Sequence, residues 1–354
     1  MSVESVPKHR RLARRNRPGF QPYRQRRESK NRRLRPCKIS ISEVPISVTL
    51  SVRGRHHRRA RLTNVLACMD MSQTTKVDFM IVGAQKCGTS TLSEILRIHP
   101  ALVRCDRKEP NFFSECEDWR AELPQYEQMF RRREGALYFE ASPSYTLYPH
   151  RKLDLWDDLH SYNPALKIIY LVRDPIERVT SGYMHSYERG YTELSFERAL
   201  VREPIFLDIT RYATQIAPFI ERFGPDRVRI VLFEDLVRDP NVLARELAIF
   251  LGIDPEGFGD VGGVHANESI GGHKRHYKYD HPGRMLSQVR RYAPPLWRMM
   301  TNNSSRAFHV KPVLSPPYRR LVLRMLQSEI DELEAMTGRD LSHWRERDGT
   351  GETG

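Results

Sequence analysis

The sequence has few cysteines and no long apolar run. Its 354 residues include five cysteines, and no two of them are spaced as Cys-x-x-Cys. Scattered thiols support neither a disulfide framework nor a zinc site, and they favour a reducing compartment. No stretch of about 20 apolar residues could cross a bilayer, and no compact apolar segment follows the first basic cluster, as a secretory signal requires. We therefore expect a cytoplasmic protein with no transmembrane segment and no bound metal.

Acidic residues are almost missing from the first 75 positions. This part has 19 Lys and Arg against 4 Asp and Glu, whereas the rest of the chain has 39 against 40. Because its Arg-rich segments contain almost no apolar residues, we expect residues 1–75 to be a disordered basic tail. The near-neutral remainder argues against an enzyme of nucleic acids.

Three interpretations of this tail stay open. It could contact nucleic acid or other polyanions electrostatically, or it could be an Arg-rich targeting peptide. It could also be an upstream extension from a misassigned start, because Met69 and Met71 lie just before the first expected strand. We favour the last interpretation, since no folding pattern precedes residue 76.

The segment 79–92 combines an apolar strand, a glycine-containing turn and a helix start. It reads Phe-Met-Ile-Val-Gly-Ala-Gln-Lys-Cys-Gly-Thr-Ser-Thr-Leu, with Gly83 and Gly88 in the turn and Thr89–Thr91 as natural helix caps. Free N–H groups at a helix start, with Lys86 beside them, form a receptor for a phosphate-like anion. A Walker A lysine follows the last glycine of its loop, whereas Lys86 precedes Gly88, so an ATPase or kinase loop fits poorly.

The segment 167–183 repeats the order of strand and helix. Residues 168–172 are apolar and β-branched, Asp174 is a good N-cap, and Pro175 suits the first helical position. Arg173 at the strand end and Ser181, two turns into the helix, could converge on a second anion. The alternative is an Arg173 salt bridge to its own helix and an ordinary helix serine.

Further alternation of strands and helices extends to residue 345, as a parallel α/β sheet requires. Additional strands are expected at 136–139 and 227–232, and helices at 89–98, 195–201, 208–223, 241–251 and 321–336. We predict one domain over residues 76–345, followed by a disordered end at 346–354.

These motifs resemble those of the sulfotransferases that use 3′-phosphoadenosine 5′-phosphosulfate (PAPS). The segment 85–92 is similar to their 5′-phosphosulfate loop, in the variant of the heparan sulfate type, and Arg173 with Ser181 matches their 3′-phosphate motif. The segment 107–113, Arg-Lys-Glu-Pro-Asn-Phe-Phe, resembles the family's Lys-Glu-x-x-Phe-Phe. The segment 140–145, Glu-Ala-Ser-Pro-Ser-Tyr, resembles its Glu-x-x-Pro-x-Tyr loop. The resemblance covers residues 77–345.

The resemblance implies a P-loop-like parallel β-sheet flanked by helices and an enzyme that moves a sulfuryl group from PAPS to a hydroxyl or amine. Glu109 would be the catalytic base, and Lys86 would offset charge on the departing oxygen. The product would be 3′-phosphoadenosine 5′-phosphate (PAP), and no metal is needed. The implied donor-binding residues are Lys86, Cys87, Gly88, Thr89, Ser90, Thr91, Arg173, Ser181, Lys274 and Arg275. The implied acceptor-binding residues are Lys108, Asn111, Ser142 and Tyr145.

The acceptor and the competing functions stay open. Heparan-type motifs favour a carbohydrate, and glycolipids or small molecules are alternatives. A P-loop-type kinase or NTPase is one competing function, and a nucleic-acid-binding protein acting through the tail is another. Cys87 is expected to be a small residue that fills the turn, although a helix start could also lower its pKa and make it reactive.

Overall fold

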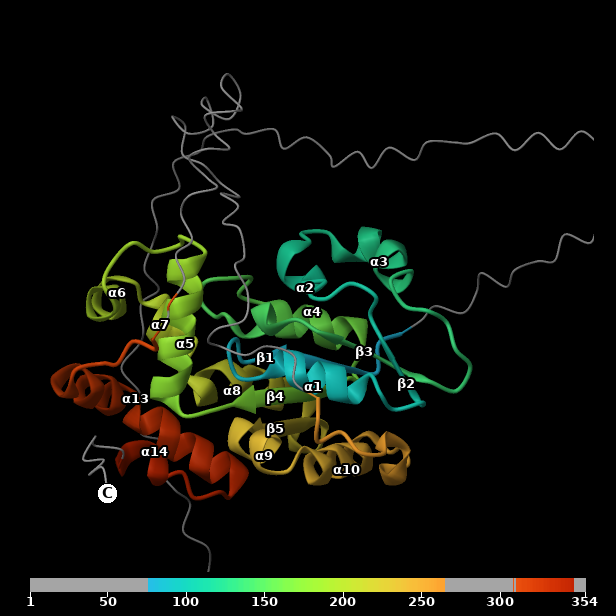
Figure 1. Ribbon diagram of the computed structural model, residues 1–354. Coiled ribbons are helices and arrows are strands. Elements are labelled where there is room, and N and C mark those ends of the chain that lie inside the picture. Colours follow the sequence, from blue (N-terminus) through green and yellow to red (C-terminus); the bar gives the residue numbers. More distant parts are fainter. Residues whose placement is uncertain (1–75, 265–307, 309, 347–354) are drawn as a thin grey trace, which may run out of the picture. The chain divides into compact units, whose positions relative to one another are not determined.

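The structure is a computed structural model of the chain, and it describes residues 76–264, 308 and 310–346 (Figure 1). Three predictions lie outside the described residues: the basic tail, the donor-phosphate residues Lys274 and Arg275, and all but the first residue of the disordered end expected over 346–354. That first residue, Glu346, ends a helix instead.

The centre of the fold is a five-stranded sheet with the order β2-β3-β1-β4-β5. Its strands are β1 (Phe79–Gly83), β2 (Leu102–Arg104), β3 (Leu137–Ala141), β4 (Lys167–Val172) and β5 (Val228–Leu232). All neighbouring strands are parallel. The predicted parallel α/β class is therefore confirmed, while the three-residue strand β2 was not predicted.

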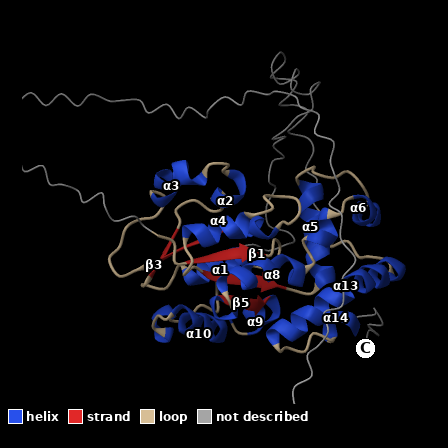
Figure 2. Ribbon diagram, turned by 180° about the vertical axis from the view of Figure 1, so that it is seen from behind, coloured by secondary structure: helices blue, strands red, loops and turns tan. Residues whose placement is uncertain are grey.

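Helices surround the strands in Figure 2, and contacts identify which strands they cover. Helix α1 packs on β1 and β3, whereas α8 packs on β4 and β5. The helices up to β5 are α1 (Thr89–Leu96), α2 (Phe112–Glu115), α3 (Trp119–Glu127), η1 (Pro143–Thr146), α4 (Leu155–Tyr162), α5 (Pro175–Glu188), α6 (Phe196–Arg202), α7 (Ile205–Asp208), α8 (Tyr212–Phe223) and η2 (Pro225–Arg227). After β5 follow α9 (Phe233–Arg238), α10 (Pro240–Leu251), η3 (Pro255–Phe258), α13 (Pro316–Thr337) and α14 (His343–Glu346).

Three predicted helices differ from the observed ones by more than one residue. The helix expected over 321–336 begins earlier, since α13 spans Pro316–Thr337. The helix expected over 89–98 ends at Leu96. The helix expected over 208–223 is divided, because Arg211 leaves helical geometry with a ψ of 72° between α7 and α8. Among the described helices, none is both long and apolar enough to span a bilayer.

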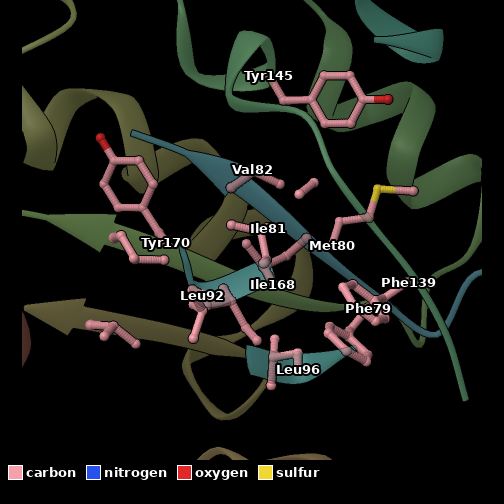
Figure 3. Packing of buried hydrophobic residues seen from close by; sticks show 14 of the residues in the cluster. Phe79, Met80, Ile81, Val82, Leu92, Leu96, Phe139, Tyr145, Ile168 and Tyr170 are labelled. Carbon is pink, nitrogen blue, oxygen red and sulfur yellow. The ribbon is translucent and has the colours of Figure 1, made fainter. Parts of the chain in front are cut away.

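The core lies around β1, whose five residues are all buried. Figure 3 shows how the side chains of β1 meet those of α1 and β3. Phe79 stacks on Phe139 with ring centroids 4.8 Å apart, and Leu92 and Leu96 of α1 are fully buried. A strand covered on both faces must be apolar throughout, which explains the uninterrupted apolar run.

The chain order places a ligand site at the end of β1. From β1 the chain goes to β2 and β3 on one side and then to β4 on the other. In open parallel sheets, ligands bind outside the carboxyl ends of the strands where the direction of winding reverses. Gly83 closes β1, and a Cβ there would lie 1.8 Å from Thr146 Oγ1. Only glycine therefore fits this strand end.

Candidate functional site

The loop between β1 and α1 exposes backbone donors. Lys86 and Gly88 have positive φ angles of 71° and 90°. Cys87 N–H donates to the Ala84 carbonyl, and Leu92 N–H donates to the Gly88 carbonyl. The intervening N–H groups of Gly88, Thr89 and Ser90 have no backbone acceptor among the described residues. Gly88 is the N-cap and no side chain caps the helix, contrary to the expected threonine and serine caps. This helix start fits an anion.

Lys86 is a desolvated cation beside this helix start. Its side chain is half-buried. Burial is the largest cause that lowers the pKa of Lys86, Glu188 opposes it, and Arg178 and Arg173 lower it further. A cation placed among other cations favours a bound anion.

Cys87 lies in this loop, and its side chain belongs to the hydrophobic core. Its side chain is buried, with Sγ 3.6 Å from the Tyr212 hydroxyl. Burial raises the pKa of the Cys87 thiol to about 11. Burial and the raised pKa argue against the hypothesis of a reactive thiol and favour the interpretation of a small residue that fills the turn. Only the backbone of Cys87 can face a nucleotide.

Arg173 follows β4, next to the loop. Its Nη2 lies 3.0 Å from Oε2 of Glu177, and its Nη1 donates to the Lys86 carbonyl at 3.3 Å. The predicted N-cap is confirmed, since Asp174 accepts from the N–H groups of Ile176 and Glu177. The helix salt bridge considered as the alternative thus exists. However, Arg173 Nε is buried without a hydrogen-bond partner among the described residues, so Arg173 still fits a bound anion.

Ser181 and Arg178 lie on α5, with 8% and 1% of their surfaces exposed. The convergence of Ser181 with Arg173 stays a prediction. Arg178 had no predicted role, and it donates to the Gln85 carbonyl at 3.3 Å and the Phe206 carbonyl at 2.7 Å. No carboxylate pairs with it among the described residues, and burial lowers its pKa. This buried charge adds positive potential beneath the β1–α1 loop.

Glu109 lies in the loop after β2. Much of the surface of Glu109 is accessible to solvent. The surrounding protein nevertheless partly desolvates the carboxyl group, and this desolvation raises the pKa of Glu109. Lys108 and then Lys86 oppose that shift. Glu109 and Lys86 come from loops after different strands, and the structure brings them close enough for their charges to interact.

Lys108 and Asn111 make specific contacts on either side of Glu109. Lys108 Nζ donates to Ser90 Oγ at 2.5 Å, which joins this loop to the start of α1. Asn111 has a positive φ of 53°. Its N–H donates to Ser142 Oγ at 3.0 Å, and its Oδ1 accepts from Ser144 Oγ at 2.7 Å.

A buried carboxylate organises the loop after β3. Glu140 is fully buried and accepts from the hydroxyls of Tyr126, Tyr145 and Ser142 at 2.8, 2.7 and 2.5 Å. Burial raises its pKa, although these three hydrogen bonds lower it. Ser142 and Tyr145 are therefore buried partners of Glu140, which favours a supporting role over the predicted acceptor contact. Sequence reasoning gave Glu140 no role of its own.

A cavity along β5 does not coincide with these residues. It has a volume of about 490 Å³, and Arg229, Phe250 and Arg339 line it. None of its lining residues was predicted to bind donor or acceptor. The residues at the strand ends, rather than this cavity, remain the candidate site.

Comparison with known proteins identifies relatives over the same region. A family model described as "Sulfotransferase domain" matches residues 76–270, more than half of the chain. Heparan sulfate glucosamine 3-O-sulfotransferase 3A1 of Mus musculus is 29% identical over 184 residues, 49% of this chain and 45% of the relative. Heparan sulfate glucosamine 3-O-sulfotransferase 6 of Homo sapiens is 30% identical over 186 residues, 49% of this chain and 52% of the relative. The chain thus spans about half the length of these relatives.

A solved structure shares the fold. The sulfotransferase from Alicyclobacillus acidocaldarius superposes with a TM-score of 0.54 at 24% identity, covering 76% of this chain and 99% of that one. At this identity the likeness shows a shared fold.

Proposed function

This chain belongs to the sulfotransferase domain family, and from that membership we propose that it transfers the sulfuryl group of PAPS to an acceptor hydroxyl or amine. The observation that carries the proposal is a pair of anion receptors at neighbouring strand ends. One is the uncapped start of α1 with Lys86, and the other is Arg173 with its buried, unpartnered Nε. Two separate receptors suit a 3′,5′-bisphosphate better than the single polyphosphate chain of ATP.

At the donor, each receptor takes one end of the nucleotide. The N–H groups of Gly88, Thr89 and Ser90, together with Lys86, hold the 5′-phosphosulfate. Arg173 and Ser181 hold the 3′-phosphate. Arg178 holds the β1–α1 loop of the first receptor in place by donating a hydrogen bond to the Gln85 carbonyl. Since these cations supply the positive charge, we propose that no metal is required.

The chemistry is an in-line displacement at sulfur. The acceptor oxygen or nitrogen forms a bond to sulfur, and the bond from sulfur to the 5′-phosphate oxygen breaks, releasing PAP. The acceptor proton goes to Glu109, whose raised pKa brings its basicity closer to neutral pH. Lys86 offsets the charge that develops on the departing oxygen.

For the acceptor, we propose a carbohydrate or a glycolipid. The support comes from the relatives, which are named as heparan sulfate glucosamine sulfotransferases. The cytoplasmic location and the contact of the basic tail with polyanions remain proposals drawn from the sequence alone.

A donor-consumption screen tests this function. The full-length protein is incubated with PAPS and panels of glycans, glycolipids and small hydroxylated or amine-bearing metabolites, and PAP release is measured. We expect acceptor-dependent PAP release that Glu109→Gln lowers by about 10²- to 10⁴-fold. Absence of PAP release with every acceptor class, from a protein that also fails to bind PAP, would contradict the proposal.

A further inference from the structure

Lys108 contacts the start of α1 rather than the loops expected around an acceptor. Its Nζ lies 2.5 Å from Ser90 Oγ, across 18 positions of sequence. Ser90 is the second residue of α1, and its N–H belongs to the open donors of that helix start. An ammonium group this close to Ser90 is within reach of any anion that the helix start holds.

We propose that Lys108 is a second cationic ligand of the donor's 5′-phosphosulfate, acting from the loop after β2 while Lys86 acts from the loop after β1. The proposal deepens the proposed function and depends on it. It reassigns Lys108 from the acceptor, where the sequence placed it, to the donor.

Hydrogen-bonding capacity supports this role. An ammonium group has three donors, and Ser90 Oγ uses one of them. The remaining donors of Lys108 have no carboxylate within ion-pair distance among the described residues. The hydroxyl of Ser90, since it accepts from Lys108, is free to donate its own proton onward. Lys108 and Ser90 can therefore both donate to one anion.

Electrostatics point the same way. Much of the surface of Lys108 is accessible to solvent, but the surrounding protein still lowers its pKa by desolvation, while the adjacent Glu109 raises it. A partly desolvated cation without an ion-pair partner gains when an anion binds beside it. Because Glu109 is the next residue, a donor contact made by Lys108 also positions the catalytic base.

Binding without acceptor tests the assignment. Dissociation constants of PAP and adenosine 5′-phosphate are measured by calorimetry for wild type, Lys108→Ala, Arg173→Ala and the control Arg107→Ala, an exposed cation one position earlier. We expect Lys108→Ala to weaken both nucleotides by a similar factor of about tenfold, as loss of a charge-assisted hydrogen bond implies. Arg107→Ala should leave both constants within about twofold of wild type, whereas Arg173→Ala should weaken PAP alone.

Ser90→Ala is the second variant, and it should weaken both nucleotides by a smaller factor. If Lys108→Ala leaves both constants unchanged and raises only the KM for the acceptor, Lys108 belongs to the acceptor site and the inference is overturned. A wild-type protein that binds no PAP would instead contradict the proposed function itself.

Discussion

Arg173 and Glu177 form an ion pair in which Nη2 lies 3.0 Å from Oε2, one helical turn apart. Lys311, from the segment before α13, pairs with the same carboxylate oxygen. Glu177 therefore compensates the guanidinium that we assign to the 3′-phosphate of the donor. Two anions, one internal and one from the ligand, compete for Arg173.

This competition predicts that Glu177→Gln strengthens PAP binding. Removing the internal anion leaves Arg173 free for the 3′-phosphate, and we expect a gain of a few-fold, since a partly exposed pair contributes roughly 1 kcal/mol or less. Adenosine 5′-phosphate, which lacks the 3′-phosphate, should bind Glu177→Gln as it binds wild type. If Glu177→Gln weakens PAP as strongly as Arg173→Ala does, then Glu177 orients Arg173 instead of competing for it.

Substitutions at Glu109 and Lys86 should have different effects on turnover and on PAP affinity. Glu109→Gln keeps size and polarity but removes basicity, so turnover should fall by about 10²- to 10⁴-fold while the Kd for PAP stays within a few-fold. Lys86→Ala should weaken PAP and turnover together, because Lys86 binds the donor in both ground and transition states. A Glu109→Gln enzyme that retains more than about a third of wild-type turnover, with chemistry rate-limiting, would not support the base assignment.

The pH dependence follows from the raised pKa of Glu109. A base works only when deprotonated, so kcat/KM should fall as pH drops through a value above the ordinary range of glutamate. Desolvation makes the ionised form less favourable in the folded protein than in the unfolded one, so Glu109 costs stability as pH rises through its folded pKa. The Tm of Glu109→Gln should therefore exceed that of wild type at neutral pH, and this difference should vanish in acid. A Tm difference of the opposite sign at neutral pH would show that Lys108 and Lys86 outweigh desolvation.

Gly88 should tolerate no side chain. Its φ is +90°, and a Cβ would lie 2.7 Å from the ring of Phe233, the same ring that Arg173 covers at 4.7 Å. Gly135 is a matched control, with a φ of +67° and nothing within 4 Å of an added Cβ. Gly135→Ala should cost about 1 kcal/mol of unfolding free energy from backbone strain alone, whereas Gly88→Ala should cost more and should also weaken PAP binding. Equal losses in chemical denaturation, with unchanged PAP affinity, would contradict the close packing of the loop.

The sequence was sufficient to predict the strands and helix starts that depend on residues close together in the chain. The apolar runs of β1 and β4 predicted buried parallel strands, and Asp174 with Pro175 predicted the start of α5. Strand β2 could not be predicted, because three residues are too short for a periodic pattern and its pairing with β3 is a tertiary event.

The candidate site also has residues that the sequence predicts and residues whose position depends on tertiary packing. Lys86 and Arg173 were placed by their order after predicted strands, since parallel strands end at one edge of the sheet. Glu109 was placed by the family resemblance, because β2 before it was not predicted. Non-local packing decided the rest. The buried Glu140 draws the hydroxyls of Ser142 and Tyr145 inward. An arginine in an amphipathic helix is usually exposed, and nothing local indicates that Arg178 is buried beneath the loop.

The most direct test of the central claim is the nucleotide preference of the wild-type protein. Titration calorimetry compares PAP, adenosine 5′-phosphate and ATP with Mg²⁺ under one buffer and salt condition. The account predicts that PAP binds at least about tenfold more tightly than adenosine 5′-phosphate, because one charge-assisted contact from Arg173 to the 3′-phosphate is worth about 1.5–3 kcal/mol. Binding of ATP with Mg²⁺ more tightly than PAP, or equal affinity for PAP and adenosine 5′-phosphate, would contradict a donor site built for a 3′,5′-bisphosphate.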